Sequence, residues 1–218
     1  MLLLLLLAAA ARAAAQDGPF KETVNPDPVG IPGAVDRFLM LTKAEDYRVE
    51  ALKTAARKLS ALKTQVETKA PASAYDADTV RIVASWLSVK PGDARYAAVL
   101  QAALAAIAKT QAVALNPMLY PDSKKICDDN DKANGTPGTW AWTVMNTPNV
   151  ALCRSWLFAS AECRRVVVVH EALHSVGLVD VDTKLKFPKR TTAVALTDAA
   201  YMAGLFSELH SMHEDRCP

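Results

Sequence analysis

The 218-residue chain has no strong excess of charge of either sign, because 25 Lys and Arg nearly balance 23 Asp and Glu and leave a formal net charge of +2. So small an excess gives no electrostatic basis for binding a phosphate backbone, and no cluster of basic and aromatic residues marks a nucleic-acid surface. With only eight glycines and no internal repeat, the chain is not fibrous. We therefore expect one ordinary globular domain, or one domain with a helical extension, without a nucleic-acid partner.

Long hydrophobic runs are absent except at the N-terminus, where residues 1–15 read MLLLLLLAAAARAAA. This run is too short to cross a hydrocarbon core of about 30 Å, and Arg12 interrupts it. An apolar run followed by small residues is typical of a secretory signal peptide. We therefore expect cleavage before Gln16, a secreted protein of the extracellular or periplasmic space, and no membrane association after cleavage.

Cysteine is absent from the first half of the chain. The four cysteines are Cys127, Cys153, Cys163 and Cys217. None has the CxxC spacing of a cysteine zinc site or a redox dithiol. An even number of cysteines in an exported chain predicts two disulfides, with three possible connectivities. We favour the pairs Cys127–Cys153 and Cys163–Cys217.

The N-terminal half of the chain is predicted to be helical after an irregular start. Residues 16–33 contain four prolines and three glycines, which predicts an irregular lead-in. From residue 34 to about residue 69, apolar residues recur every three or four positions, which is typical of an amphipathic helix. Two further helices are expected to follow, and they begin near Asp78 and Asp93. Residues 34–116 are therefore predicted to form a helical subdomain or a prosegment.

The composition of the chain changes after Pro117. Residues 117–218 are predicted to form the catalytic subdomain. Residues 118–137 are polar and turn-rich. Aromatic and β-branched residues alternate over residues 139–145, which indicates a strand. Residues 150–156 form a second candidate strand, and turn residues separate the two. We therefore expect an antiparallel hairpin in a predominantly helical α+β fold. A last helix is predicted over residues 197–212.

A short motif at residues 170–174, HEALH, indicates which chemistry the chain can perform. On a helix, His170 and His174 share one face, so both imidazoles can bind one Zn²⁺ ion. Glu171 is then placed beside the metal rather than on it, where it can take a proton from a water molecule. We therefore predict a helix in this region, despite the four consecutive valines that precede the motif.

A third ligand is predicted just after the motif. Gly177 can end the helix in a left-handed conformation and turn the chain, which would bring Asp180 back to the two histidines. Three protein ligands and one open position are typical of a catalytic zinc site. Asp198 and Glu208 remain alternative third ligands, since the residue type alone cannot choose among carboxylates.

The segment HEALHSVGLVD resembles the zinc-binding helix of the metzincin metallopeptidases, HExxHxxGxxH, in which Asp replaces the last His in some members. This resemblance implies His170, His174 and Asp180 as zinc ligands and Glu171 as the catalytic acid and base. The sequence from Asp198 to Tyr201 is similar to the DxxY part of the aspzincin signature. That second resemblance implies Asp198 as the third ligand and Tyr201 as a group that stabilises the oxyanion.

These observations together predict a secreted, monomeric zinc metalloendopeptidase that hydrolyses peptides or proteins. Two other classes remain open at this point. One is an exported module that binds zinc without turnover. The other is a helical binding domain, stapled by disulfides, in which HExxH occurs by chance.

Overall fold

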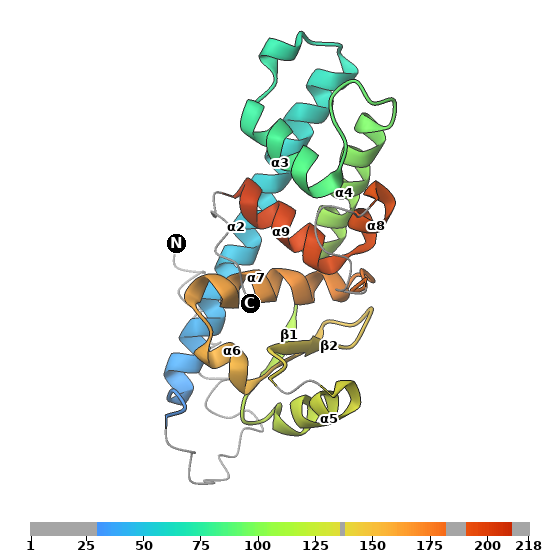
Figure 1. Cartoon of the computed structure of the whole chain (residues 1–218). Coiled ribbons are helices and arrows are strands. Elements are labelled where there is room, and N and C mark those ends of the chain that lie inside the picture. The colour runs from blue at the N-terminus through green and yellow to red at the C-terminus, as the bar shows by residue number, and fades with distance from the viewer. Residues whose placement is uncertain (1–29, 136–137, 182–190, 211–218) are drawn as a thin grey trace. The chain divides into compact units, whose positions relative to one another are not determined.

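In this computed structural model, the described residues are 30–135, 138–181 and 191–210 (Figure 1). The chain divides into two compact units, residues 1–32 and residues 33–218. Only residues 30–32 of the first unit are described, so the predicted signal peptide and most of the predicted lead-in lie outside the described residues. All elements named below belong to the second unit.

Helices dominate the described part of the second unit, and a small sheet accompanies them. The helices are α2 (Ala34–Glu67), the 3₁₀ helix η1 (Ala72–Ala74), α3 (Ala77–Leu87), α4 (Tyr96–Gln111), α5 (Lys124–Asn134), α6 (Arg154–Phe158), α7 (Ala161–His174), α8 (Thr192–Thr197) and α9 (Ala199–Leu209). The strands are β1 (Asn116–Leu119), β2 (Ala141–Thr143) and β3 (Asn149–Leu152). The predicted α+β class with helices dominant is confirmed.

The long helix α2 follows from the spacing of its apolar residues. Its buried side chains lie along one face of the helix, at Ala44, Arg48, Ala51, Leu52, Ala55, Leu59 and Leu62. With this face it contacts α4, α7 and α9. Leu52 and Leu59 of α2, Leu173 of α7 and Phe206 of α9 are completely buried in one hydrophobic cluster. Helix α7, which carries the HEALH motif, is therefore built into the main core.

The sheet has the order β1-β3-β2 and is mixed rather than antiparallel. Strands β2 and β3 form the predicted antiparallel hairpin, with Thr143 opposite Val150. The prediction missed β1, which pairs with β3 in parallel. The predicted second strand is also shorter than expected, because β3 ends at Leu152 and the chain continues as helix α6. In α6, Trp156 is completely buried and donates its indole N–H to the carbonyl oxygen of Arg164 on α7.

The segment predicted to be turn-rich contains helix α5 instead. Its polar side chains form ion pairs one turn apart, between Lys124 and Asp128 and between Lys125 and Asp129. Cys127 of α5 forms a disulfide with Cys153, as predicted, and this bond joins the helix to the end of β3. The second predicted pair involves Cys217, which lies outside the described residues.

The predicted C-terminal helix begins later than expected, at Ala199, and the short helix α8 precedes it. Asp198 separates the two helices and caps α9 with its side chain. Among the described residues, no helix combines the length and the apolar character that a membrane span requires.

Candidate metal centre

The site is built on helix α7. The hydroxyl of Ser160 accepts the backbone N–H of Cys163 and so caps the N-terminus of the helix. Further along, Val169 and Leu173 are completely buried against the core. The apolar residues thus fix the rotation of the helix about its axis, and this rotation directs the two motif histidines away from the core.

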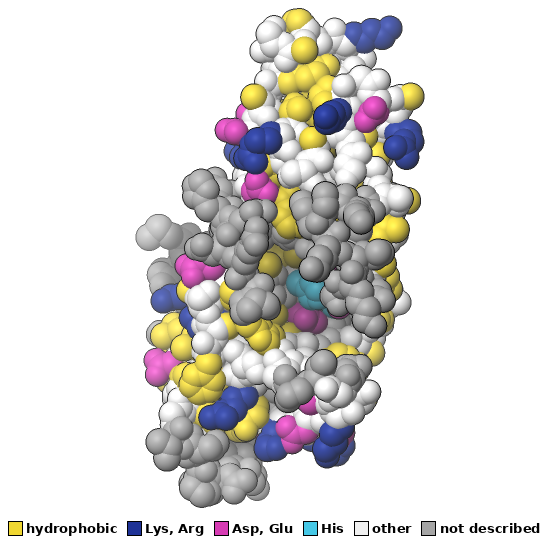
Figure 2. Space-filling view, viewed as in Figure 1, with side chains coloured by type: hydrophobic (Ala, Val, Ile, Leu, Met, Phe, Trp, Pro, Cys, Tyr) yellow, Lys and Arg dark blue, Asp and Glu magenta, His cyan; other side chains and the backbone are white. Residues whose placement is uncertain are grey.

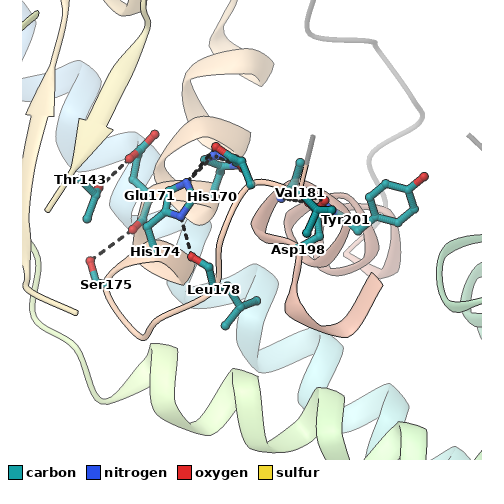
Figure 3. Close-up of polar contacts among 11 residues, drawn as sticks. Thr143, His170, Glu171, His174, Ser175, Leu178, Val181, Asp198 and Tyr201 are labelled. Atoms are coloured by element: carbon teal, nitrogen blue, oxygen red, sulfur yellow. Dashed lines mark hydrogen bonds and ion pairs between the residues drawn. The ribbon is translucent and has the colours of Figure 1, made fainter. Parts of the chain in front are cut away.

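The histidines converge as their spacing requires. His170 and His174 lie one turn apart, with their rings at 87° and the two Nε2 atoms 2.9 Å apart (Figure 3). Both Nε2 atoms therefore point to one position in space. The side chain of His174 is the more deeply buried of the two.

A tight turn ends α7 and returns the chain to the histidines. Gly177 has φ +93°, in the left-handed region that favours glycine. Its N–H donates to the carbonyl oxygen of His174, and the N–H of Leu178 donates to that of Leu173, which is the Schellman pattern. A β-carbon on Gly177 would lie 2.7 Å from Oδ1 of Asn146. Glycine is therefore required here both by the backbone and by the available space.

The turn brings Asp180 to the histidines, as predicted. Its Oδ1 lies 3.4 Å from Nε2 of His170, and its Oδ2 lies 3.3 Å from Nε2 of His174. The candidate ligand atoms of all three side chains lie within 4.8 Å of one another. Ligands about 2.0–2.2 Å from a tetrahedral zinc ion lie roughly 3.3–3.5 Å apart, so the two carboxylate–imidazole separations fit such an ion.

The site is open to solvent on one side. The side chain of Asp180 is 54% exposed, whereas those of His170 and His174 are 22% and 11% exposed. Figure 2 shows a histidine and an acidic side chain together in a hollow of this face, with hydrophobic side chains beside them. A fourth position on an ion held here would be accessible to water or to a substrate.

Asp180 and His174 shift each other's pKa values in opposite directions. Burial alone would raise the pKa of Asp180, but hydrogen bonds and charge interactions with His170 and His174 lower it well below its usual range. Burial alone would lower the pKa of His174, but hydrogen bonds with Asp180 and with the carbonyl of Leu178 outweigh burial and raise it.

Glu171 lies toward the sheet, between Thr143 and the two histidines (Figure 3). It is 5% exposed, and its Oε2 accepts a hydrogen bond of 2.6 Å from the hydroxyl of Thr143 on β2. Burial raises the pKa of Glu171, although nearby His170 and the Thr143 hydroxyl act in the opposite direction. A carboxyl group with a raised pKa can hold a proton as well as accept one, which suits a general acid and base.

The alternative third ligands lie elsewhere. Glu208 accepts a hydrogen bond of 3.2 Å from Arg81 and one of 2.6 Å from the indole N–H of Trp86. Asp198 accepts backbone N–H groups at the start of α9. Neither belongs to the cluster of candidate ligands among the described residues. The geometry therefore favours Asp180.

Tyr201 is not placed with the cluster. Its side chain lies in the hydrophobic core and meets the ring of Trp86 edge to face, with 5.7 Å between the ring centroids. In Figure 3 its ring is directed away from the two histidines. We assign it no part in the chemistry proposed below.

Sequence reasoning missed Thr143, the one side chain in the described residues that donates a hydrogen bond to Glu171. The alternation of the hairpin gave no signal for it, because that pattern would place the apolar Trp142 and Val144 inward and Thr143 outward. In the structure Trp142 and Val144 are exposed and Thr143 is buried between them. This orientation depends on how β2 packs on α7, which the local sequence does not determine.

Comparison of the chain with protein-family models, with curated proteins and with solved structures found no match. Function is therefore inferred from the chemistry of the site itself.

Proposed function

We propose that this protein is a zinc-dependent peptidase whose metal is held by His170, His174 and Asp180 and whose general acid and base is Glu171. The observation that supports this most strongly is the convergence of two imidazoles and one carboxylate, with a fourth direction open to solvent. Three protein ligands and an open position are the arrangement of catalytic rather than structural zinc sites.

The chain's own residues have separate tasks in this scheme. The two histidines and Asp180 bind and orient the ion through nitrogen and carboxylate oxygen, which are ligands that suit zinc. Zinc bound there would supply Lewis acidity, which polarises a carbonyl group and lowers the pKa of water. The half-exposed Asp180 leaves room beside the ligands for the peptide group of a substrate.

Glu171 moves the proton. Its Oε2 is held by Thr143, and no residue in the described part of the chain donates a hydrogen bond to Oε1. Oε1 takes a proton from the attacking water and then delivers it to the nitrogen of the leaving amine, as the carbon–nitrogen bond breaks. Water is consumed, and the products are a carboxylic acid and an amine.

Export is part of the proposal. The disulfide between Cys127 and Cys153 is expected for a protein of an oxidising compartment, in agreement with the signal peptide predicted at residues 1–15. We propose that the mature chain begins at Gln16 and acts as a secreted monomer.

The test compares Glu171→Gln with Glu162→Gln, a matched change near the start of the same helix. Hydrolysis of a mixed peptide library is followed by mass spectrometry, and zinc content is measured in parallel. We expect Glu171→Gln to keep its zinc and lose about 10²–10⁴-fold of the activity, the usual contribution of general acid–base catalysis. Glu162→Gln should match the wild type.

Two results would contradict the proposal. The first is hydrolysis that survives Glu171→Gln or removal of the metal by a chelator. The second is a wild-type protein that binds zinc and cleaves no peptide, which would indicate a zinc-binding module without turnover.

A further inference from the structure

Asp198 is a buried carboxylate whose two oxygens have different partners. The residue is 1% exposed. Oδ1 accepts the backbone N–H groups of Ala200 at 2.9 Å and of Tyr201 at 3.1 Å, and so caps helix α9. Oδ2 accepts the backbone N–H of Val181 at 3.4 Å (Figure 3). One oxygen thus accepts hydrogen bonds from helix α9, and the other accepts one from the segment that carries Asp180.

Backbone hydrogen bonds attach the same segment on the other side of Asp180. Val179 donates its N–H to the carbonyl oxygen of Thr197 and accepts the N–H of Ala199, both at 3.0 Å. These two bonds form a short parallel bridge between Val179 and Asp198. The backbone is therefore held immediately before Asp180 by the main chain around Asp198, and immediately after Asp180 by the Asp198 side chain.

We propose that Asp198 is a positioning residue that holds the metal-binding carboxylate of Asp180 in place. This inference rests on the proposed function, because it assumes that Asp180 binds zinc. Asp180 follows a turn and its side chain is half exposed, and the side-chain contacts described for it are those with the two histidines that would share the metal, so its position depends on how the backbone on either side is held. A ligand that is already in place costs less conformational freedom when the metal binds, and this raises the affinity.

Asparagine separates the two tasks of Asp198. Asparagine is as good an N-cap as aspartate, but its amide has a single accepting oxygen. That oxygen is expected to face the two N–H groups of α9 rather than the longer single bond from Val181. The NH₂ group then meets the Val181 N–H, and two donors repel each other. Asp198→Ser provides a second variant, since its hydroxyl also caps a helix and is too short to serve both partners.

The experiment measures zinc affinity by competition with a chromophoric chelator. Asp198→Asn and Asp198→Ser are compared with the wild type and with Asp131→Asn. Asp131 is a matched control, because its carboxylate accepts the backbone N–H groups of Gly138 and Thr139 but belongs to helix α5. We expect both Asp198 variants to bind zinc about 10-fold or more weakly, within the range for losing a partner outside the metal ligands. Asp131→Asn should match the wild type.

A double-mutant cycle identifies the route of the effect. In an Asp180→Ala background, Asp198→Asn should cause no further loss of zinc affinity, because the ligand that it positions is gone. Exchange of the Val181 amide hydrogen in the metal-free protein gives a readout that needs no zinc. We expect this exchange to be faster in both Asp198 variants.

The outcomes separate the inference from the proposed function. Zinc affinity equal to wild type in both Asp198 variants overturns the inference alone, as does an undiminished loss in the Asp180→Ala background. Unchanged exchange at Val181 also overturns it. A wild-type protein that binds no zinc overturns the proposed function itself, and the inference with it.

Discussion

His174 donates its Nδ1–H to the backbone carbonyl oxygen of Leu178 across 2.7 Å. A carbonyl oxygen can only accept, so the hydrogen must be on Nδ1, and the lone pair of the neutral ring is then on Nε2. Nε2 is the atom that faces His170 and Asp180. The turn that ends α7 thus brings in the third candidate ligand and also orients the second.

The protonation of His174 predicts how zinc affinity depends on pH. The pKa of His174 is raised above its usual 6.5, so protons already compete with zinc above pH 6.5 and compete more strongly as the pH falls. The pKa of Asp180 is lowered, so its carboxylate stays ionised over the same range. We expect zinc affinity to fall as pH decreases from 8 to 5. Isothermal titration calorimetry at several pH values measures this, and an affinity independent of pH would contradict it.

Thr143→Val should uncouple Glu171 from the sheet. Valine has nearly the shape of threonine but cannot donate to Oε2, so the buried carboxylate loses the one hydrogen bond it receives from a described side chain. We expect a loss of about 1.5–3 kcal/mol in the free energy of unfolding, the usual range for a hydrogen bond to a charged group, together with reduced peptide hydrolysis. Urea unfolding measures the first effect. Thr143→Ser keeps the hydroxyl and should recover most of both.

Gly177→Ala tests the turn. A β-carbon at φ +93° is strained by about 1–2 kcal/mol, and it would also force the side chain of Asn146 to move. Gly135→Ala is the control, because Gly135 has φ +65° and open space around it. Both variants should be less stable to heat, but zinc affinity should fall only in Gly177→Ala. Equal zinc affinity in the two variants would show that the turn does not position Asp180.

The convergence of His170, His174 and Asp180 could be predicted because it depends on local rules. Residues four apart share a helix face, and glycine permits the turn that follows. Those rules do not involve the rest of the fold. That the three side chains bind zinc stays a prediction.

Other features depend on segments that are distant in the sequence. Strand β1 has only four residues and begins with Asn116 and Pro117, which are typical of a helix end, so its parallel pairing with β3 is visible only in the folded chain. Helix α5 has few apolar residues and is held by its ion pairs and by the disulfide from Cys127. Asp198 has the pattern of a simple helix cap, and only the folded chain brings the Val181 N–H to its second oxygen. The sequence pattern therefore indicated the candidate ligands but not the residues that support them.

The most direct test is the zinc content of the purified chain, measured by native mass spectrometry for the wild type and for His170→Ala, His174→Ala and Asp180→Ala. We expect one zinc ion per wild-type chain, none in either histidine variant, and weaker retention in Asp180→Ala. A wild-type chain without zinc, or a His174→Ala chain that retains it fully, would contradict the shared metal site.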